Sequence, residues 1–128
     1  MLKDNRITMI VEKTDTGFSA YAEKNSIFTT GKTITELTNN AFEAAELHYE
    51  GNLVKLTHDD IKFEFDFQQF FQYYRVLNAK YLAKRIGMNE TLLSQYVQGH
   101  KKPSKKQTDK ILSGIHEIGQ ELSSLSLI

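Results

Sequence analysis

Apolar and polar residues alternate at the start of the chain. Residues 7–12 place apolar side chains on one face and mostly polar ones on the other, which is the period of a β-strand. Residues 18–23 alternate in the same way, and residues 14–17 between them form a turn sequence in which Gly17 can adopt a positive φ. The two stretches predict a β-hairpin, followed by a short strand around residues 27–29 that ends at Gly31.

Residues 33–51 have the period of a helix instead. Thr33 and Glu36 have the spacing of a capping box, which marks a helix start. The side chains expected to face a sheet recur every three or four residues: Ile34, Leu37, Ala41, Ala44, Ala45 and His48. Gly51 and Asn52 are expected to end this helix. Residues 61–67 alternate again, so the order is β-β-β-α-β, an α+β layer of one sheet with one helix.

The second half of the chain is helical in pattern. Asp66 and Gln69 have capping-box spacing, and helix-spaced apolar residues follow: Phe67, Phe70, Phe71, Tyr74 and Leu77. Ser104 and Gln107 form one more such pair, directly after Pro103. The last predicted helix carries apolar residues spaced 4, 3, 4 and 3 apart: Ile111, Ile115, Ile118, Leu122 and Leu125.

Residues 79–98, AKYLAKRIGMNETLLSQYVQ, have the pattern of two helices that meet at a tight corner. Such a corner needs a small residue where the helices approach, which is Ala83, and a turn residue that tolerates positive φ, which is Gly87. Asn89 is a favourable N-cap for the second helix. Five apolar residues stand at the positions that fill the inside of the corner: Leu82, Ile86, Met88, Leu93 and Tyr96.

Composition and charge divide the chain in two. With 128 residues, 40 % hydrophobic and 25 % charged, it has the composition of an ordinary globular protein with no membrane-spanning run, and its start does not resemble a signal peptide. The absence of cysteine excludes disulfides and thiolate metal sites, so a cytoplasmic protein is expected. Residues 1–67 hold 7 basic and 12 acidic residues (7 − 12 = −5), whereas residues 68–128 hold 9 and 4 (9 − 4 = +5). Two domains with these bounds and different partners are therefore expected.

The segments ITMIVEKTDTGFSAYAE and IFTTGKTITELTNNAFEAAELHYE resemble the N-terminal domain of HicB-type antitoxins. The resemblance implies a partial ribonuclease-H-like fold without catalytic machinery, which binds a small basic mRNA-cleaving toxin of the HicA type. The proline-containing segment that many members carry after the second strand is missing here. On the sheet face opposite Met9, we expect apolar anchors and a steering acidic field for that toxin: Ile10, Tyr21, Glu23, Glu64 and Asp66.

The corner at 79–98 and the following residues 99–104, GHKKPS, resemble the Cro/repressor type of helix-turn-helix. In that family the start of the second helix enters the major groove of double-stranded DNA. The resemblance assigns base reading to Glu90, Thr91, Ser94 and Gln95. Glu90 either accepts from cytosine N4 or only stabilises the helix N-terminus through the dipole. The expected phosphate contacts are Lys80, Lys101, Lys102, Lys105 and Lys106.

These patterns support three hypotheses. The first is an antitoxin that neutralises a HicA-like toxin and represses its own operon as a homodimer, with Ile118, Leu122 and Leu125, and also Leu127 and Ile128, near the subunit interface. The alternative is a stand-alone transcriptional regulator with a ligand-sensing or dimerising N-terminal domain. A degenerate nuclease, with Glu12, Asp15, Glu64 and Asp66 as metal-binding carboxylates, ranks last. No enzyme activity, cofactor, metal or membrane partner is expected.

Overall fold

The computed structural model describes residues 7–51 and 55–127. It divides into two compact units, Met1–Gln69 and Phe70–Ile128, a boundary two residues later than the expected one. The described residues form a mixed α+β structure with one four-stranded sheet and five α-helices. No helix among them is both long and apolar enough to cross a membrane.

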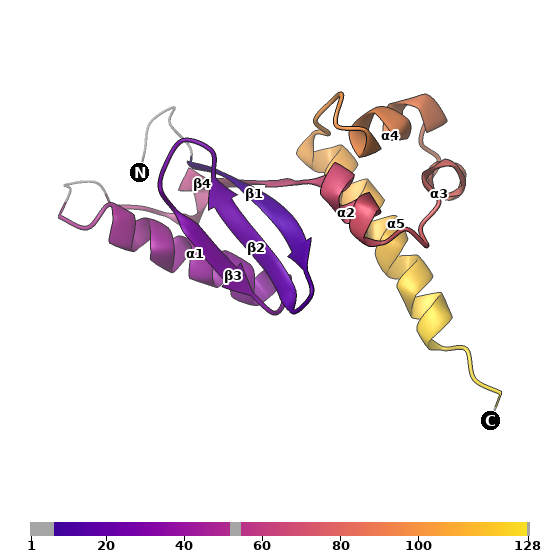
Figure 1. The fold of residues 1–128 in the computed structure, drawn as a ribbon, viewed down its shortest axis with the longest axis horizontal. Coiled ribbons are helices and arrows are strands. Elements are labelled where there is room, and N and C mark those ends of the chain that lie inside the picture. Colours follow the sequence, from indigo (N-terminus) through magenta and orange to yellow (C-terminus); the bar gives the residue numbers. More distant parts are fainter. Residues whose placement is uncertain (1–6, 52–54, 128) are drawn as a thin grey trace. The chain divides into compact units, whose positions relative to one another are not determined.

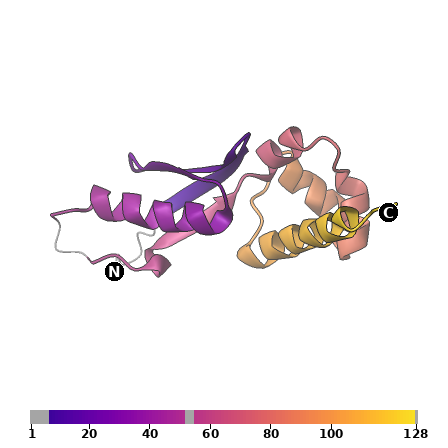
Figure 2. The ribbon, with the colours of Figure 1, turned by 90° about the horizontal axis from the view of Figure 1, so that it is seen from below.

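The first unit contains a mixed sheet covered on one face by a helix. Its strands are β1 (Ile7–Thr14), β2 (Gly17–Ala22), β3 (Phe28–Gly31) and β4 (Ile61–Phe65), in the spatial order β3-β2-β1-β4 (Figure 1). The hairpin is antiparallel, as is the β2–β3 pair, while β4 runs parallel to β1. Helix α1 (Ile34–His48) lies across one face of this sheet (Figure 2). The predicted β-β-β-α-β order is confirmed.

The core of this unit lies between α1 and the sheet. The alternating residues Ile7, Met9 and Val11 of β1 are at most 4 % exposed, as the pattern predicts. They pack with Leu37 and the alanines of α1 that let the helix approach closely. Ile34 and His48, expected on this face, are exposed: they are the first and last residues of α1, whose buried residues lie between them.

The element ends differ from the expected ones at four places. The side chain of Thr33 caps α1 as predicted, with Glu36 N 3.1 Å from its Oγ1. The helix ends at His48, before Gly51, and Asn52 lies outside the described residues. The third strand begins one residue later than expected, at Phe28, and ends at Gly31 as predicted. Phe67 is the first residue of α2 (Phe67–Tyr73) rather than the last of β4, and this helix stops before the predicted Tyr74 and Leu77.

Gly17 has the predicted positive φ, and the neighbouring strand gives a second reason for glycine at this position. The turn itself consists of Asp15 and Thr16, and Gly17 begins β2 with φ +158°, close to extended backbone. A Cβ at this position would lie 2.3 Å from the carbonyl oxygen of Gly31 on β3. Close approach of the neighbouring strand therefore requires glycine here, in addition to the positive φ.

Gln69 links α2 to β1. Its backbone N–H donates to Asp66 Oδ1 (3.0 Å), so Asp66 caps α2 as the spacing predicts. Its side chain does not complete the capping box. Instead, its amide accepts from Lys13 N (2.8 Å) and donates to Lys13 O (2.7 Å). This pair of hydrogen bonds fixes the start of α2 against the end of β1.

The second unit is helical, as expected. It contains α3 (Ala79–Ile86), α4 (Glu90–Val97) and α5 (Lys105–Ser123). Each of these helices begins at a side-chain cap, Asn78, Asn89 and Ser104 in turn, whose oxygen accepts from a backbone N–H three residues later. The cap that begins α5 comes directly after Pro103, where the sequence pattern placed it.

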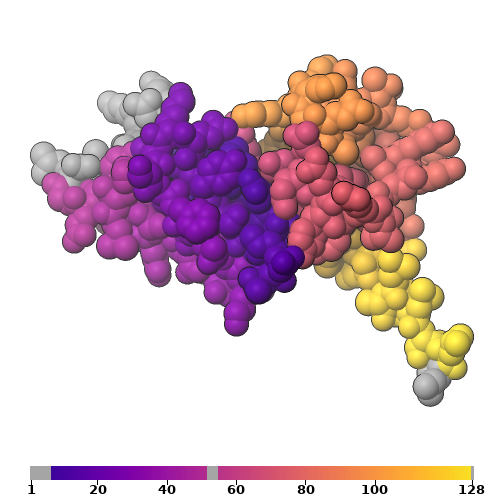
Figure 3. Space-filling model, in the orientation of Figure 1, coloured from indigo at the N-terminus to yellow at the C-terminus, as the bar shows by residue number. Residues whose placement is uncertain are grey.

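Helix α5 completes the core of this unit and then extends beyond it. Ile111 is fully buried, and Gly114 approaches α3 so closely that a Cβ there would lie 2.3 Å from Ile86 Cγ2. The last turns extend past α3 and α4 (Figures 1 and 3). Leu122 and Leu125 are accordingly 61 % and 75 % exposed. Ile128, expected to join this apolar surface, lies outside the described residues.

Candidate functional site

The α3–α4 corner is built from the side chains that the sequence pattern selected. Leu82, Ala83, Met88, Leu93 and Tyr96 are all at most 8 % exposed, and Ile111 of α5 closes the core beneath them. Ile86 is half-buried, because it faces Gly114 at the edge of this core. The corner therefore holds α3 and α4 in one packed arrangement with α5.

Two glycines shape the ends of α3 and α4. Gly87 has φ +69° and ψ +34°, the left-handed conformation that a helix-ending glycine adopts readily. Met88 N then donates to Ala83 O (2.9 Å), which closes the turn before Asn89 starts the next helix. Gly99, with φ +78°, ends α4 in the same way, and His100 N donates to Gln95 O (2.8 Å).

This second turn attaches the lysine-rich loop to α4. Lys101 N also donates to Gln95 O, at 3.3 Å. The backbone of Gln95, one of the residues expected to read bases, is thus hydrogen-bonded to the loop that is expected to bind phosphates. Because the bonds are between backbone groups, they fix the start of that loop whatever side chains it carries.

The four candidate base-reading residues lie on the first two turns of α4. Glu90 and Thr91 are exposed in the first turn, and Ser94 and Gln95 are half-buried one turn later. Their backbone begins at the Asn89 cap, so the start of the helix is well defined. Its exposed residues carry the polar groups that base edges require.

The candidate phosphate contacts differ in their local partners. All five lysines are exposed. Among the described residues, Lys80, Lys101 and Lys106 make no ion pair, whereas Lys105 Nζ lies 3.0 Å from Asp109 Oδ2, one turn further along α5. The loop and the start of α5 thus present basic side chains on both sides of Pro103.

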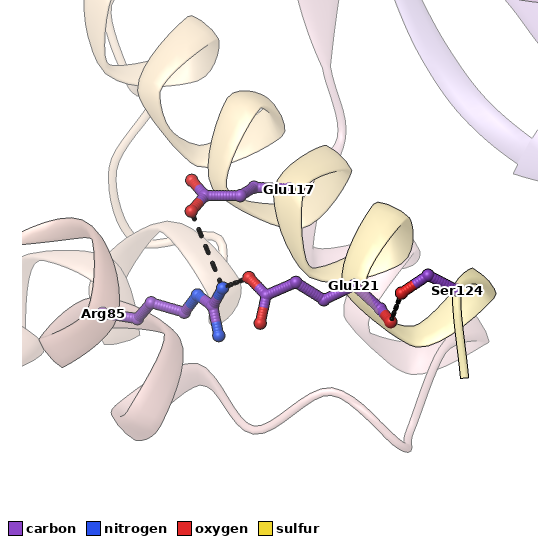
Figure 4. Close-up of polar contacts among 4 residues, drawn as sticks. All are labelled: Arg85, Glu117, Glu121 and Ser124. Carbon is purple, nitrogen blue, oxygen red and sulfur yellow. Dashed lines mark hydrogen bonds and ion pairs between the residues drawn. The ribbon is translucent and has the colours of Figure 1, made fainter. Parts of the chain in front are cut away.

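Two further basic residues, on α3, are engaged by carboxylates that sequence reasoning did not assign to them. Lys84 Nζ lies 3.8 Å from Glu90 Oε1, across the turn between α3 and α4. Arg85 pairs with both Glu117, at 3.7 Å, and Glu121 of α5 (Figure 4). The i, i+4 spacing of Glu117 and Glu121 is visible in the sequence, but their common partner on another helix is not.

A second candidate surface is the sheet face not covered by α1. Phe28, Tyr21, Ile10 and Glu64 occupy one row across the four strands, as the strand pairing places them side by side. Tyr21 is 38 % and Phe28 66 % exposed. Ile10, expected to be an exposed anchor, is only 9 % exposed, and it lies between Tyr21 and Glu64 of the neighbouring strands. The exposed apolar residue beside Tyr21 is instead Phe28, on the edge strand β3. Its signal in the sequence was an apolar residue on a short strand.

Carboxylates surround Tyr21 on this face. Partial burial, the negative charges of Glu12, Asp66 and Glu23, and a hydrogen bond to Glu12 all raise the pKa of Tyr21, with burial the largest cause. Glu64 pairs with Lys62 at 3.5 Å, and Asp66 serves as the α2 cap. Two neighbouring aromatic side chains bordered by acidic groups are complementary to a basic protein surface, both in charge and in apolar contact.

No metal site is formed by the carboxylates considered as nuclease candidates. Within residues 7–51 and 55–127, no group of three His, Asp or Glu side chains is arranged to hold a metal ion. Asp15 lies in the hairpin turn rather than on the open face of the sheet. No family model, curated protein or solved structure matches the chain. A function for this chain therefore has to be inferred from the arrangement of its side chains.

Proposed function

We propose that the chain is an antitoxin and transcriptional regulator, whose second unit binds operator DNA and whose first unit binds a small basic HicA-like toxin. The observation that carries the DNA-binding part is the α3–α4 corner, with Gly87 in the left-handed conformation and Asn89 as the cap. That geometry, with a lysine-rich loop bonded to the end of α4, is what insertion of a helix into the major groove needs.

The residues divide by role. Gln95 has the amide that forms two hydrogen bonds with adenine, and Thr91 has a methyl group suited to the thymine methyl. Lys101 and Lys106, which have no ion pair among the described residues, are the clearest phosphate contacts, and Lys80 at the start of α3 is a third. Phosphate contacts supply affinity and salt dependence, whereas Gln95 supplies sequence preference.

The short length of α4, the helix proposed to read bases, implies that the protein binds DNA as a dimer. One short helix reads only a few base pairs, so useful selectivity needs two half-sites about 34 Å apart. The exposed Leu122 and Leu125, on the part of α5 that extends past the core, offer an apolar surface for that contact. Sedimentation is expected to give twice the 14.7 kDa chain mass at micromolar concentration. Removing both leucine side chains should shift it to the monomer.

The DNA experiment measures fluorescence anisotropy of duplexes from the region upstream of the coding sequence and of a scrambled duplex, over a range of salt. Replacing Lys101 and Lys106 with alanine should weaken both duplexes alike and reduce the log–log salt slope by about 0.9 for each phosphate that is no longer neutralised. Gln95→Ala should cost about 1–3 kcal/mol on the preferred duplex alone. Lys32→Ala, an exposed lysine of the first unit, is the matched control. Equal weakening on both duplexes after Gln95→Ala would exclude base reading.

The toxin experiment uses the open sheet face. Full-length protein is co-expressed with the product of the adjacent gene, and growth rescue and co-purification are scored. Tyr21→Ala and Phe28→Ala should speed dissociation of the complex, while Glu23→Gln should mainly slow association. If the neighbour encodes no small basic protein and no rescue occurs, the stand-alone regulator becomes the better hypothesis.

A further inference from the structure

Glu90 and Lys84 form an ion pair across the DNA-facing side of the proposed corner. The carboxylate is at the first position of α4, and the ammonium is in the last turn of α3. Their closest atoms are 3.8 Å apart, and the ammonium also lies 5.3 Å from the centre of the Tyr81 ring. Lys84 is thus held from two sides by groups of its own chain.

We propose that Glu90 is an intramolecular substitute for a DNA phosphate: it occupies Lys84 in the free protein, and a backbone phosphate displaces it in the complex. This role rests on the proposed DNA binding. In this role, Glu90 lowers the affinity of the protein for DNA of any sequence. Lys84 then contributes to affinity only to the extent that a phosphate competes with the carboxylate.

The exposure of the two groups makes such an exchange feasible. The side chains of Lys84 and Glu90 are 56 % and 43 % exposed, so both are hydrated and screened. Exposed ion pairs of this kind change an equilibrium by about fivefold or less, which a DNA phosphate can overcome. Tyr81 keeps the ammonium near the surface while the partner changes, since its ring attracts a cation without neutralising it.

Arg85, the next residue, is a contrasting case. It is engaged by two carboxylates, Glu117 and Glu121, which belong to the same face of α5. Those ion pairs join α3 to α5 and so support the fold of the unit. Among residues 7–51 and 55–127, Lys84 has one carboxylate partner, and that partner lies on the helix proposed to read DNA.

The proposed role differs measurably from the two roles that the sequence left open for Glu90. A carboxylate that reads cytosine affects one base pair of one preferred sequence. A carboxylate that only stabilises the α4 dipole affects the unfolding free energy but leaves the DNA affinity unchanged. A phosphate substitute affects every duplex equally, and it acts only when Lys84 is present.

The experiment is a double-mutant cycle on the full chain, with Glu90→Gln, Lys84→Gln and the combination, read by anisotropy with a preferred and a scrambled duplex at several salt concentrations. Glu90→Gln should raise affinity for both duplexes by up to about fivefold, because Lys84 then binds a phosphate without first losing its carboxylate partner. Lys84→Gln should weaken binding to both duplexes and reduce the salt slope by about 0.9, the loss of one phosphate contact, and it should remove the gain from Glu90→Gln in the combined variant. Glu117→Gln is the control for removal of an acid elsewhere, and circular dichroism checks that each variant is folded.

Three outcomes would overturn the proposal. A Glu90→Gln effect confined to the preferred duplex would assign the residue to base reading. An equal gain with and without Lys84 would reduce its role to plain repulsion of phosphates. If the wild-type chain binds no duplex at any salt concentration, the proposed DNA-binding function fails and this role fails with it, whereas the first two outcomes leave that function intact.

Discussion

Replacing Gly114 and Gly119 separately with alanine tests the packing that holds the corner together. Both glycines lie inside α5, so the same methyl group is added to the same helix. At Gly114 the new Cβ would lie 2.3 Å from Ile86 Cγ2 and 3.7 Å from Leu82 Cδ1. At Gly119 it would meet nothing within 4 Å. The two substitutions therefore differ only in whether α3 lies in the way.

The magnitudes follow from two opposing effects. Alanine is favoured over glycine inside a helix by about 0.8–1.0 kcal/mol, which applies at both positions. Forcing a methyl group into an occupied space typically costs about 1–3 kcal/mol, and Ile86 is β-branched, with few alternative rotamers in a helix. Gly119→Ala should therefore stabilise the second unit by nearly 1 kcal/mol, while Gly114→Ala should be neutral or destabilising by up to about 2 kcal/mol.

Urea unfolding of the full chain, followed by the helical signal in circular dichroism, measures the difference. The expected separation between the two variants is about 1–3 kcal/mol. Adding Ile86→Ala, which removes the clashing atom, should abolish most of the penalty in the Gly114→Ala background. If both alanine variants stabilise the protein equally, α3 and α5 are not in close contact at Gly114 and the argument for one packed unit is refuted.

Other predictions concern caps, the strand–helix link and titration. Asn89→Ala should destabilise the second unit by about 1 kcal/mol while Asn89→Asp preserves it, and destabilisation in both variants would show that the cap is not the cause. Gln69→Ala should destabilise the first unit by about 1–3 kcal/mol in urea unfolding, because both backbone groups of Lys13 lose a partner. Phenol absorbance should show Tyr21 titrating above the ordinary value of 10.0, and less so in Glu12→Gln. Because folding raises the pKa of Tyr21, protonated Tyr21 contributes to the free energy of unfolding. That contribution is complete below pH 10 and is lost as the pH rises through the raised pKa. A Tyr21 titration at the ordinary value would contradict this prediction.

Sequence alone determined the elements whose stabilising groups lie close together along the chain. The Thr33, Asn89 and Ser104 caps each bond to a backbone N–H three residues away, so the pattern that predicts them contains both partners. Gly87 was predictable for the same reason, because the left-handed turn requires glycine locally. The apolar positions of the corner followed from helical spacing. These features required no knowledge of what lies across the fold.

Tertiary structure alone decided which distant groups meet. The side chain of Gln69 bonds to the backbone of a residue 56 positions earlier, although its spacing predicted a second capping bond instead. Ile10 alternates like an exposed strand residue, yet between Tyr21 and Glu64 of the neighbouring strands it is only 9 % exposed. Likewise, nothing local distinguishes Gly114 from Gly119, which differ only in the helix that lies opposite.

The same distinction applies to the charges. Sequence determined that the second half is basic, since a count of residues needs no geometry. It did not determine that Glu90 would lie beside Lys84, or that Arg85 would lie between two carboxylates of α5. An ion pair depends on a separation of a few ångströms between side-chain ends, and that separation is set by how helices pack, which local periodicity does not encode.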